Sequence, residues 1–225
     1  MMKIGILIPT REEAVGLPAG IPCATGFGPG KTAACAAVSK LLFQDGCDAI
    51  FVWGTAGALR REQPLGGMMV VDQVAYSDYD VSPLYGSDGL GFVPEIAETC
   101  WMDCHPGFLC ALREKVPEFF PNHPLLSGRI AAGDVFDNAK YYRADNRIEN
   151  AADGVDMESP AVVHFCRLAE RIQGRTIPVG VLRLLSNYIG VSAGDEFLET
   201  LKDISAINAK MGEFLPALAA SLEEG

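Results

Sequence analysis

The sequence predicts an α/β fold, a single-domain three-layer α/β/α sandwich with a mixed central sheet. Short segments that are almost continuous in apolar residues indicate strands covered on both faces. They alternate with longer segments whose apolar residues recur at helical spacing, which is typical of a parallel or mixed sheet with helices on both faces. The 225 residues, 49% of them hydrophobic, contain no repeat, low-complexity tract or linker, so we expect one domain over residues 1–225.

The expected strands are apolar runs that end at a turn signal. The first begins close to the N-terminus and is ended by Pro9, and the second runs into the small residues 54–57, which we expect to form a turn. In chain order, the predicted strands cover residues 3–8, 49–53, 66–81, 127–137 and 177–187.

The expected helices combine helical spacing of apolar residues with few helix breakers. The segment 31–43 contains no Gly or Pro. Ser159, followed by Pro160 at an early position where proline is tolerated, marks the start of another helix. In chain order, the predicted helices cover residues 31–43, 94–103, 106–115, 159–172 and most of 195–222.

The formal net charge of −11 argues against partners that require clustered positive charge, namely nucleic acid and anionic membranes. We therefore expect a small-molecule partner. No segment is long and apolar enough to span a bilayer, and the N-terminal residues reach acidic side chains after a short apolar run, unlike a secretion signal. These observations predict a cytoplasmic protein.

Seven scattered cysteines do not form the dense framework of a small secreted domain, so reduced thiols are expected. Cys100, Cys104, His105 and Cys110 are close in sequence, but they lack a CxxC knuckle and a second pair at zinc spacing. Buried free cysteine is also a common core residue. We therefore expect no metal and no other cofactor.

The stretch GFGPGKTAA, residues 26–34, looks at first like a phosphate-binding loop. Such a loop needs a Gly, four residues and then Gly-Lys-Ser/Thr. Counting back from Lys31 places Thr25 where the first glycine belongs, so the motif fails by one residue. We expect Lys31 to begin a helix rather than to bind phosphate.

Polar residues follow several of the predicted strands. The segments 10–13, 54–57, 133–137, 155–158 and 186–187 combine small residues with a carboxylate, an amide or a hydroxyl group. Ligands of open α/β sheets bind at the carboxyl ends of strands. The pattern suits a neutral polar ligand held by hydrogen bonds better than it suits a polyphosphate.

Six motifs, in this order, resemble those of the nucleoside phosphorylase and nucleosidase superfamily, and most closely those of its hydrolases. They are KIGILIPTREE, GPGK, VWGTAGAL, AAGDVFDN, VDMESPAVVHFC and VLRLLSN, and they extend over nearly the whole chain. These hydrolases include methylthioadenosine/S-adenosylhomocysteine nucleosidase and futalosine hydrolase. The resemblance implies a three-layer sandwich that forms a homodimer or a larger homo-oligomer and acts on a nucleoside and water.

The resemblance also implies catalytic roles for three residues. Glu13 matches the carboxylate that orients and deprotonates the attacking water, and Arg183 matches an arginine that helps to hold Glu13 and this water. Asn187, the third, stands at the position that contacts the leaving base. Glu158 is an implied substrate-binding residue, which matches the carboxylate that binds the ribose hydroxyls. The other implied substrate-binding residues are Met157 beside the sugar, Phe136 on the base, Asp137 at the base edge, Thr55, Ala56 and Gly57 beside ribose and base, Asp156 and Ser186 in the same motifs, and Phe27 and Pro29 at the 5′ end.

Trp53 departs from the phosphorylases, which carry an arginine there to bind the attacking phosphate. An indole cannot replace a bidentate, charged phosphate ligand. Hydrolysis is therefore favoured over phosphorolysis, and we expect the nearby Arg60 and Arg61 to face solvent.

Asn187 departs from the aspartate of the adenine-specific nucleosidases, which can protonate N7 of the leaving base. An amide can offer its carbonyl to N7–H and its NH2 to a 6-oxo group, which favours a 6-oxopurine. The leading interpretation is a futalosine hydrolase that releases hypoxanthine from futalosine in menaquinone biosynthesis. The alternatives are a methylthioadenosine/S-adenosylhomocysteine nucleosidase, a 6-oxopurine nucleoside phosphorylase and a non-enzymatic nucleoside-binding protein.

A third departure is the short segment between Glu13 and the glycine loop, where the family usually has two further strands. One edge of the sheet is therefore expected to be trimmed. A more open 5′ side, or a different pairing of subunits, would follow from this.

Overall fold

The computed structural model describes residues 2–136, 146–190 and 192–224. Within these ranges one mixed sheet contains eight strands. They are β1 (Ile4–Ile8), β2 (Cys23–Thr25), β3 (Ala49–Ala58), β4 (Met68–Tyr76), β5 (Met102–Asp103), β6 (Leu125–Ala132), β7 (Gly154–Asp156) and β8 (Val179–Tyr188).

Five of the strands close a ring of hydrogen-bonded pairs. β3 pairs in parallel with β8, β8 pairs antiparallel with β4, and β4 pairs in parallel with β6. β6 then pairs in parallel with β7, which returns antiparallel to β3. β1 pairs in parallel with β3 on one side and with the short edge strand β2 on the other. β5 pairs antiparallel with β4. β2 has only three residues, and the trimming of this edge relative to the family stays a prediction.

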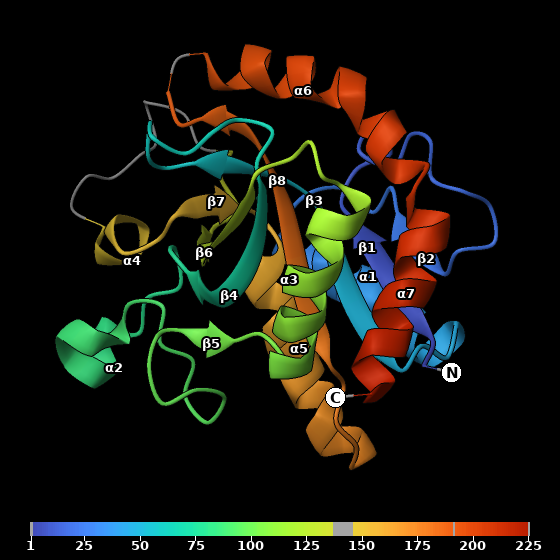
Figure 1. Cartoon of the computed structure of the whole chain (residues 1–225). Coiled ribbons are helices and arrows are strands. Elements are labelled where there is room, and N and C mark those ends of the chain that lie inside the picture. The colour runs from blue at the N-terminus through green and yellow to red at the C-terminus, as the bar shows by residue number, and fades with distance from the viewer. Residues whose placement is uncertain (1, 137–145, 191, 225) are drawn as a thin grey trace.

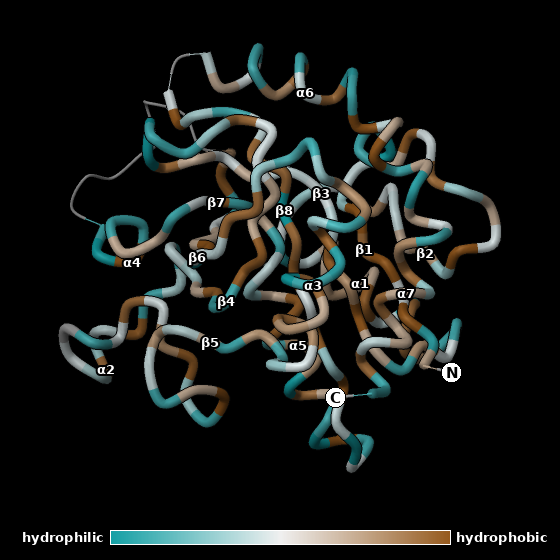
Figure 2. Tube along the Cα trace, viewed as in Figure 1, coloured by the Kyte–Doolittle hydropathy of each residue, from teal (hydrophilic) through white to brown (hydrophobic). Residues whose placement is uncertain are grey.

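The helices cover both faces of the sheet. α1 packs with α5, and α3 packs with α7. Alternate residues of β3 enter two separate cores, with Ile50 and Val52 on one side and Phe51 and Trp53 on the other. Figure 1 shows α6 across the end of the molecule near β8, and the hydrophobic colour in Figure 2 follows the central strands. The helices are α1 (Lys31–Ser39), α2 (Ser82–Tyr85), α3 (Pro106–Phe119), α4 (Arg147–Asn150), α5 (Ser159–Gln173), α6 (Ala193–Asn208) and α7 (Met211–Glu224), with a π-helical turn at Lys40–Gln44 and a 3-10 turn at Gly86–Gly89.

The predicted fold class is confirmed, and most long elements lie where the sequence predicts them. The segment 54–57 is a correction, because it continues β3 as a strand and does not form a turn. Pairing with β8 extends to Ala58, with an irregularity between Ala56 and Gly57. The long parallel partner therefore keeps these small residues extended.

The predicted helix 94–103 is wrong. Its end forms β5, which pairs with β4 through Asp103 and Gln73. Thr99 Oγ1 also accepts from Trp101 N at 3.1 Å and donates to Trp101 O at 3.3 Å. Such local side-chain bonds compete with helical backbone pairing.

The single helix predicted within 195–222 is also wrong, because the chain forms two helices, α6 and α7. The first ends at Asn208 and packs on β8, and the second packs on α3. Each helix buries its apolar face against a different partner, so the helical direction changes between them.

The described residues contain no helix with the length and hydropathy needed to cross a membrane. All seven cysteines lie in the described ranges and are free thiols. Burial raises the pKa of Cys23 to about 11, with Lys40 partly opposing the shift. The structure pairs none of the seven in a disulfide, and their reduced state stays a prediction.

Candidate active site

A pocket of about 280 Å³ lies where β3, β7 and β8 approach one another. Its walls come from the segments after β1, β6 and β7, from β3 and β8, and from α6. The lining residues are Pro9, Thr10, Glu13, Pro29, Thr55, Ala56, Gly57, Val135, Phe136, Val155, Asp156, Met157, Glu158, Ser186, Asn187 and Phe197.

Glu13 is buried in the turn after β1, with four donors fixing its carboxylate. Oε1 accepts from the Thr55 backbone N and from Thr55 Oγ1, both at 2.8 Å. Oε2 accepts from Thr10 Oγ1 at 2.9 Å and from Thr10 N at 3.3 Å. Glu13 N donates to Thr10 Oγ1 at 3.2 Å, so the two residues form the reciprocal contact of a capping box. The carboxylate is held in one orientation at the pocket wall.

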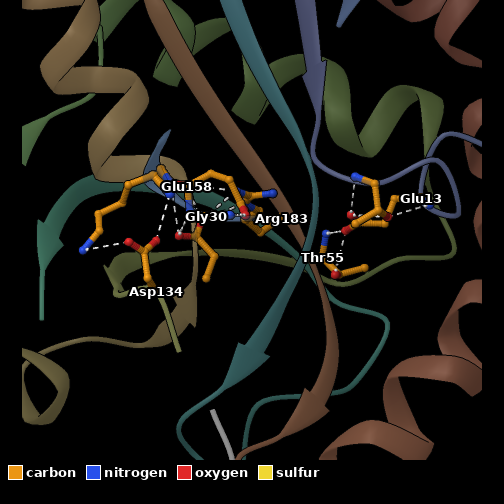
Figure 3. Close-up of polar contacts among 10 residues, drawn as sticks. Glu13, Gly30, Thr55, Asp134, Glu158 and Arg183 are labelled. Carbon is orange, nitrogen blue, oxygen red and sulfur yellow. Dashed lines mark hydrogen bonds and ion pairs between the residues drawn. The ribbon is translucent and has the colours of Figure 1, made fainter. Parts of the chain in front are cut away.

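Glu158 lies after β7 and forms the second buried carboxylate of the pocket. Its Oε1 accepts from Gly30 N at 2.9 Å, and its Oε2 accepts from Arg183 Nη2 at 3.2 Å. Burial raises the pKa of Glu158 from its usual 4.5 to about 7, while Arg183 opposes the shift and Asp156 adds to it. In Figure 3, Glu13 and Thr55 form one group of contacts, and Glu158, Gly30, Arg183 and Asp134 form another.

Arg183, on β8, is fully buried and forms ion pairs with two carboxylates, Asp156 at the end of β7 and Glu158 just after it. Its Nε donates to Asp156 Oδ2 at 2.9 Å, and its Nη2 forms an ion pair with the same oxygen at 2.8 Å. Asp156 Oδ1 in turn accepts from the backbone N of Glu158 and of Ser159, both at 3.2 Å. In this arrangement Asp156 supports Arg183 and the start of α5, although it also lines the pocket.

Arg183 lies beside Glu13 without bonding it among the described contacts. Its buried Nη1 has no hydrogen-bond partner in the described part of the chain. A Cβ at Gly54 would lie 2.8 Å from Nη1 and 2.9 Å from Glu13 Oε1. The missing side chain of Gly54 therefore leaves the space in which both polar groups meet.

Asn187 is buried at the end of β8, next to the small residues of β3. Its Oδ1 accepts from Ser186 Oγ at 2.8 Å, and its Nδ2 donates to Tyr188 O at 3.3 Å. A Cβ at Gly57 would approach Nδ2 to 3.2 Å, so a larger residue would crowd the amide. Phe136 meets Phe197 of α6 edge-on, with ring centroids 6.1 Å apart. These aromatic rings add an apolar wall to the pocket.

The structure brings most of the predicted site residues to this one pocket. Arg183 stands behind the lining, bonded to Glu158. Phe27 is 45% exposed and is not among the described lining residues. Asp137 lies outside the described residues.

Sequence reasoning did not include Pro9, Gly30 and Phe197 in the site. It gave no individual role to Thr10, Val135 and Val155, although they lie in the strand-end segments 10–13, 133–137 and 155–158 that it indicated. The T-x-x-E spacing of Thr10 and Glu13 is a recognisable capping-box signal. Gly30 and Phe197 carry no such signal, because their distant partners are set by the tertiary fold.

The glycine loop has a structural role in place of phosphate binding. Lys31 begins α1, as predicted, and its Nζ donates to both oxygens of Asp78, at 2.7 and 2.6 Å. Lys31 N donates to Asp134 Oδ1 at 2.9 Å. Arg60 and Arg61 are exposed, as predicted. Within the described ranges, no three His, Cys, Asp or Glu side chains cluster as metal ligands would.

Fold and pocket together define an α/β/α sandwich whose ligand site contains three carboxylates with buried side chains, Glu13, Asp156 and Glu158, and a buried amide. The family model described as phosphorylase superfamily matches residues 20–219. The chain belongs to this superfamily and groups with its nucleosidases, which are N-glycosyl hydrolases. The family recognised from the six motifs is therefore confirmed.

Two curated relatives illustrate the kinship. An aminodeoxyfutalosine nucleosidase of Helicobacter pylori is 30% identical over 184 residues, which cover 79% of this chain and 73% of the relative. A 5′-methylthioadenosine/S-adenosylhomocysteine nucleosidase of Aeromonas salmonicida is 28% identical over 189 residues, covering 81% and 76%.

Solved structures share the fold over almost the whole chain. Futalosine hydrolase of Helicobacter pylori superposes with a TM-score of 0.76 at 23% identity, covering 97% of each chain. A 5′-methylthioadenosine/S-adenosylhomocysteine nucleosidase from Colwellia psychrerythraea, in complex with adenine, has a TM-score of 0.79 at 23% identity, covering 98% of this chain and 96% of that one.

Proposed function

We propose that this protein hydrolyses the N-glycosidic bond of a 5′-modified 6-oxopurine nucleoside, with futalosine as the leading substrate. The observation that carries the proposal is the pocket in which Glu13, Glu158 and Asn187 stand together. These three side chains supply a group for the water, a group for the ribose and a group for the base.

Glu13 is the proposed acceptor of the water proton. Water attacks the anomeric carbon, its oxygen forms the new C–O bond, and its proton passes to the carboxylate as the C–N bond breaks. Arg183 is proposed to help hold Glu13 and this water, because its Nη1 and Glu13 Oε1 come within 2.8 and 2.9 Å of the position that a Cβ of Gly54 would take. Fixed donors around Glu13 keep the carboxylate oriented before the substrate arrives.

Glu158 is the proposed ligand of the ribose hydroxyls. Its ionised form accepts their O–H groups, and these contacts strengthen as positive charge develops on the ring. Met157, the residue before it, lines the same pocket and is proposed to pack beside the sugar.

Asn187 is the proposed contact of the leaving base, and Phe136 is proposed to stack on it. The base leaves with the electron pair of the glycosidic bond and gains its proton at N7 from solvent. The amide then accepts from N7–H through Oδ1 and donates through Nδ2 to the 6-oxo group.

The surroundings of Trp53 support water rather than phosphate as the attacking group. The side chain is fully buried, and its indole Nε1 donates to Asn208 Oδ1 at 2.7 Å. A buried indole whose only donor is occupied offers no charge or fork of donors to a phosphate.

The deciding experiment incubates the purified protein with futalosine, aminodeoxyfutalosine, inosine, methylthioadenosine and S-adenosylhomocysteine in phosphate-free buffer. Released bases are separated by chromatography. We expect hypoxanthine release from futalosine to have the highest kcat/KM. Strict dependence on added phosphate would overturn the hydrolase assignment, and a higher kcat/KM for a 6-aminopurine substrate would overturn the base assignment.

A methylthioadenosine/S-adenosylhomocysteine nucleosidase is the second candidate, because the Aeromonas salmonicida relative carries that name. Asn187→Asp separates the candidates by restoring the acid of the adenine-specific enzymes. We expect the ratio of 6-aminopurine to 6-oxopurine cleavage to rise in this variant. An unchanged ratio would show that Asn187 does not select the base.

A non-enzymatic nucleoside-binding protein would use the same pocket without activating water. Glu13→Gln distinguishes this class, since it keeps the shape of the side chain and removes the proton acceptor. We expect loss of hydrolysis with retained binding of hypoxanthine, measured by calorimetry. A wild-type protein that binds nucleosides but cleaves none would favour the binding protein.

A further inference from the structure

Asn208, the last residue of α6, is fully buried and joins two parts of the chain that are distant in sequence. Its Oδ1 accepts from Trp53 Nε1 at 2.7 Å. Its Nδ2 donates to the backbone carbonyls of Glu13 at 2.7 Å and Val15 at 2.8 Å. One side chain thus connects the core tryptophan of β3 to the turn that carries the carboxylate.

The turn after β1 has little regular structure of its own. Its backbone makes local turn contacts, such as Ala14 N to Arg11 O at 3.2 Å, and Thr10 O at its start accepts from Thr25 Oγ1 of β2 at 2.8 Å. Gly16 packs against the same helix, where a Cβ would come within 2.6 Å of Ser205 O. The backbone position of Glu13 therefore depends on α6.

We propose that Asn208 is a positioning residue, which sets the reach of the Glu13 carboxylate by anchoring the backbone of its turn to Trp53. The inference rests on the proposed function, since it takes Glu13 as the group that activates water. Thr10 and Thr55 orient the carboxylate tip, whereas Asn208 fixes the backbone from which the side chain extends. Trp53 is then the fixed point that holds Asn208, in addition to standing where the phosphorylases have an arginine.

Asn208→Asp is the most direct test. The substitution keeps the size of the side chain and an acceptor for Trp53, but it replaces the NH2 group, which donates to both carbonyls, by a single carboxylate oxygen that repels them. Displacing a catalytic group by about 1 Å can cost about 100-fold in rate. We expect kcat to fall by about tenfold or more for the substrate that the wild-type protein cleaves best. The Kd for the product base should change by less than about threefold.

The rate is expressed per base-binding site, with sites counted by calorimetric titration. A residue needed only for folding would reduce the number of sites and leave kcat per site unchanged. Asn122→Asp is the matched control, because it makes the same chemical change on an exposed loop, and we expect wild-type kcat. Trp53→Phe removes the donor to Asn208 while leaving both carbonyl contacts, so a smaller loss in kcat is expected.

The losses in kcat caused by Asn208→Asp and Trp53→Phe should not add up in the double variant, because both substitutions act through one chain of contacts. Should Asn208→Asp yield no folded protein, Trp53→Phe alone decides, and an unchanged kcat per site in that variant overturns the inference. Unchanged kcat per site in a folded Asn208→Asp variant overturns it as well. A wild-type protein that cleaves no nucleoside removes the proposed function itself, which is a distinguishable result.

Discussion

Gly30 contributes to the site through its backbone. Its N–H donates to Glu158, and it adopts a φ of 102°, a conformation that side chains disfavour. A Cβ would also lie 2.9 Å from Asp134 Oδ1, the group that bonds Lys31 N. The loop that resembles a phosphate-binding motif therefore supports the proposed ribose ligand.

Gly30→Ala should lower both stability and substrate binding. We expect a loss of about 1–3 kcal/mol in the free energy of unfolding and a raised KM, because the bond to Glu158 is displaced. Gly28→Ala is the matched control, since Gly28 has a similar φ of 94° but nothing within 4 Å of a Cβ. Both variants carry the strain of a positive φ, which urea unfolding measures, so the discriminating difference is in KM. Steady-state kinetics that gave the same KM for the two variants would contradict the account.

The pH dependence of activity should report on Glu158. Since burial raises its pKa to about 7, the carboxyl is protonated below that pH and ionised above it. We therefore expect kcat/KM to rise between pH 6 and 8, the range in which the ribose ligand gains its charge. Glu158→Gln has no carboxyl to titrate, so its residual activity should lack this rise; the same rise in the variant would assign the titration to another group.

Among the elements, β3 extends beyond the end of its neighbour β1, and this extension forms part of the site. Its pairing with β1 extends only to Val52, while its pairing with β8 continues to Ala58. Beyond the end of β1, the Thr55 N–H is free to donate to Glu13. The strand supplies the site because this edge is left unpaired between Val52, where the pairing with β1 ends, and Gly57, where the pairing with β7 begins.

Thr55→Val tests this contribution of β3. Valine keeps the branched shape and the backbone N–H but removes the hydroxyl that donates to Glu13 Oε1. A hydrogen bond to a charged group contributes about 1.5–3 kcal/mol, so we expect kcat to fall by about tenfold or more. Thr55→Ser keeps the hydroxyl and should stay close to wild type; equal activity of the two variants would exclude the contact from catalysis.

α6 is held against β8 by polar contacts at the pocket end. Thr200 Oγ1 donates to Ser186 O at 2.9 Å, and Tyr188 N donates to Glu196 Oε2 at 2.8 Å. The neighbouring Phe197 lines the pocket, and Asn208 reaches the turn of Glu13. One helix therefore contacts both the base side and the water side of the proposed site.

At the scale of the whole molecule, β7 and β8 bring together a buried charge cluster. Arg183 from β8 meets Asp156 at the end of β7 and Glu158 just after it, with all three side chains almost fully buried. Buried charges are costly unless they are paired and hydrogen-bonded. The cluster therefore ties fold stability to the site.

Arg183→Met should destabilise the protein by about 3–5 kcal/mol at pH 8, because it leaves two buried carboxylates without their cation. The loss should be smaller at pH 5, where Glu158, with its raised pKa of about 7, is protonated and needs no cation. Urea unfolding at the two pH values measures both. An equal loss at pH 5 and pH 8 would contradict the role assigned to Glu158.

The family resemblance implies a homo-oligomer, and this stays a prediction. Light scattering coupled to gel filtration would measure the oligomeric state. It bears on the 5′ end of the proposed substrate, where Pro29 lines the pocket and Phe27 does not. A partner subunit over the exposed Phe27 would enclose that end.

The sequence predicted the long strands and helices because buried apolar runs and helical spacing are local patterns. It failed at 94–103, where pairing with β4 decided the conformation, and within 195–222, where two packing partners divided one amphipathic segment. Glu13, Glu158 and Asn187 were predicted because they stand in ordered motifs.

By itself, the sequence determined the fold class, the superfamily and the chemical groups of the proposed site. Only the tertiary structure decided which groups meet: Gly30 with Glu158, Gly54 between Arg183 and Glu13, and Asn208 with the turn of Glu13. The physical reason is that motifs record local chemistry, whereas hydrogen bonds between distant segments depend on strand register and helix placement. Neither strand register nor helix placement follows from the local sequence pattern.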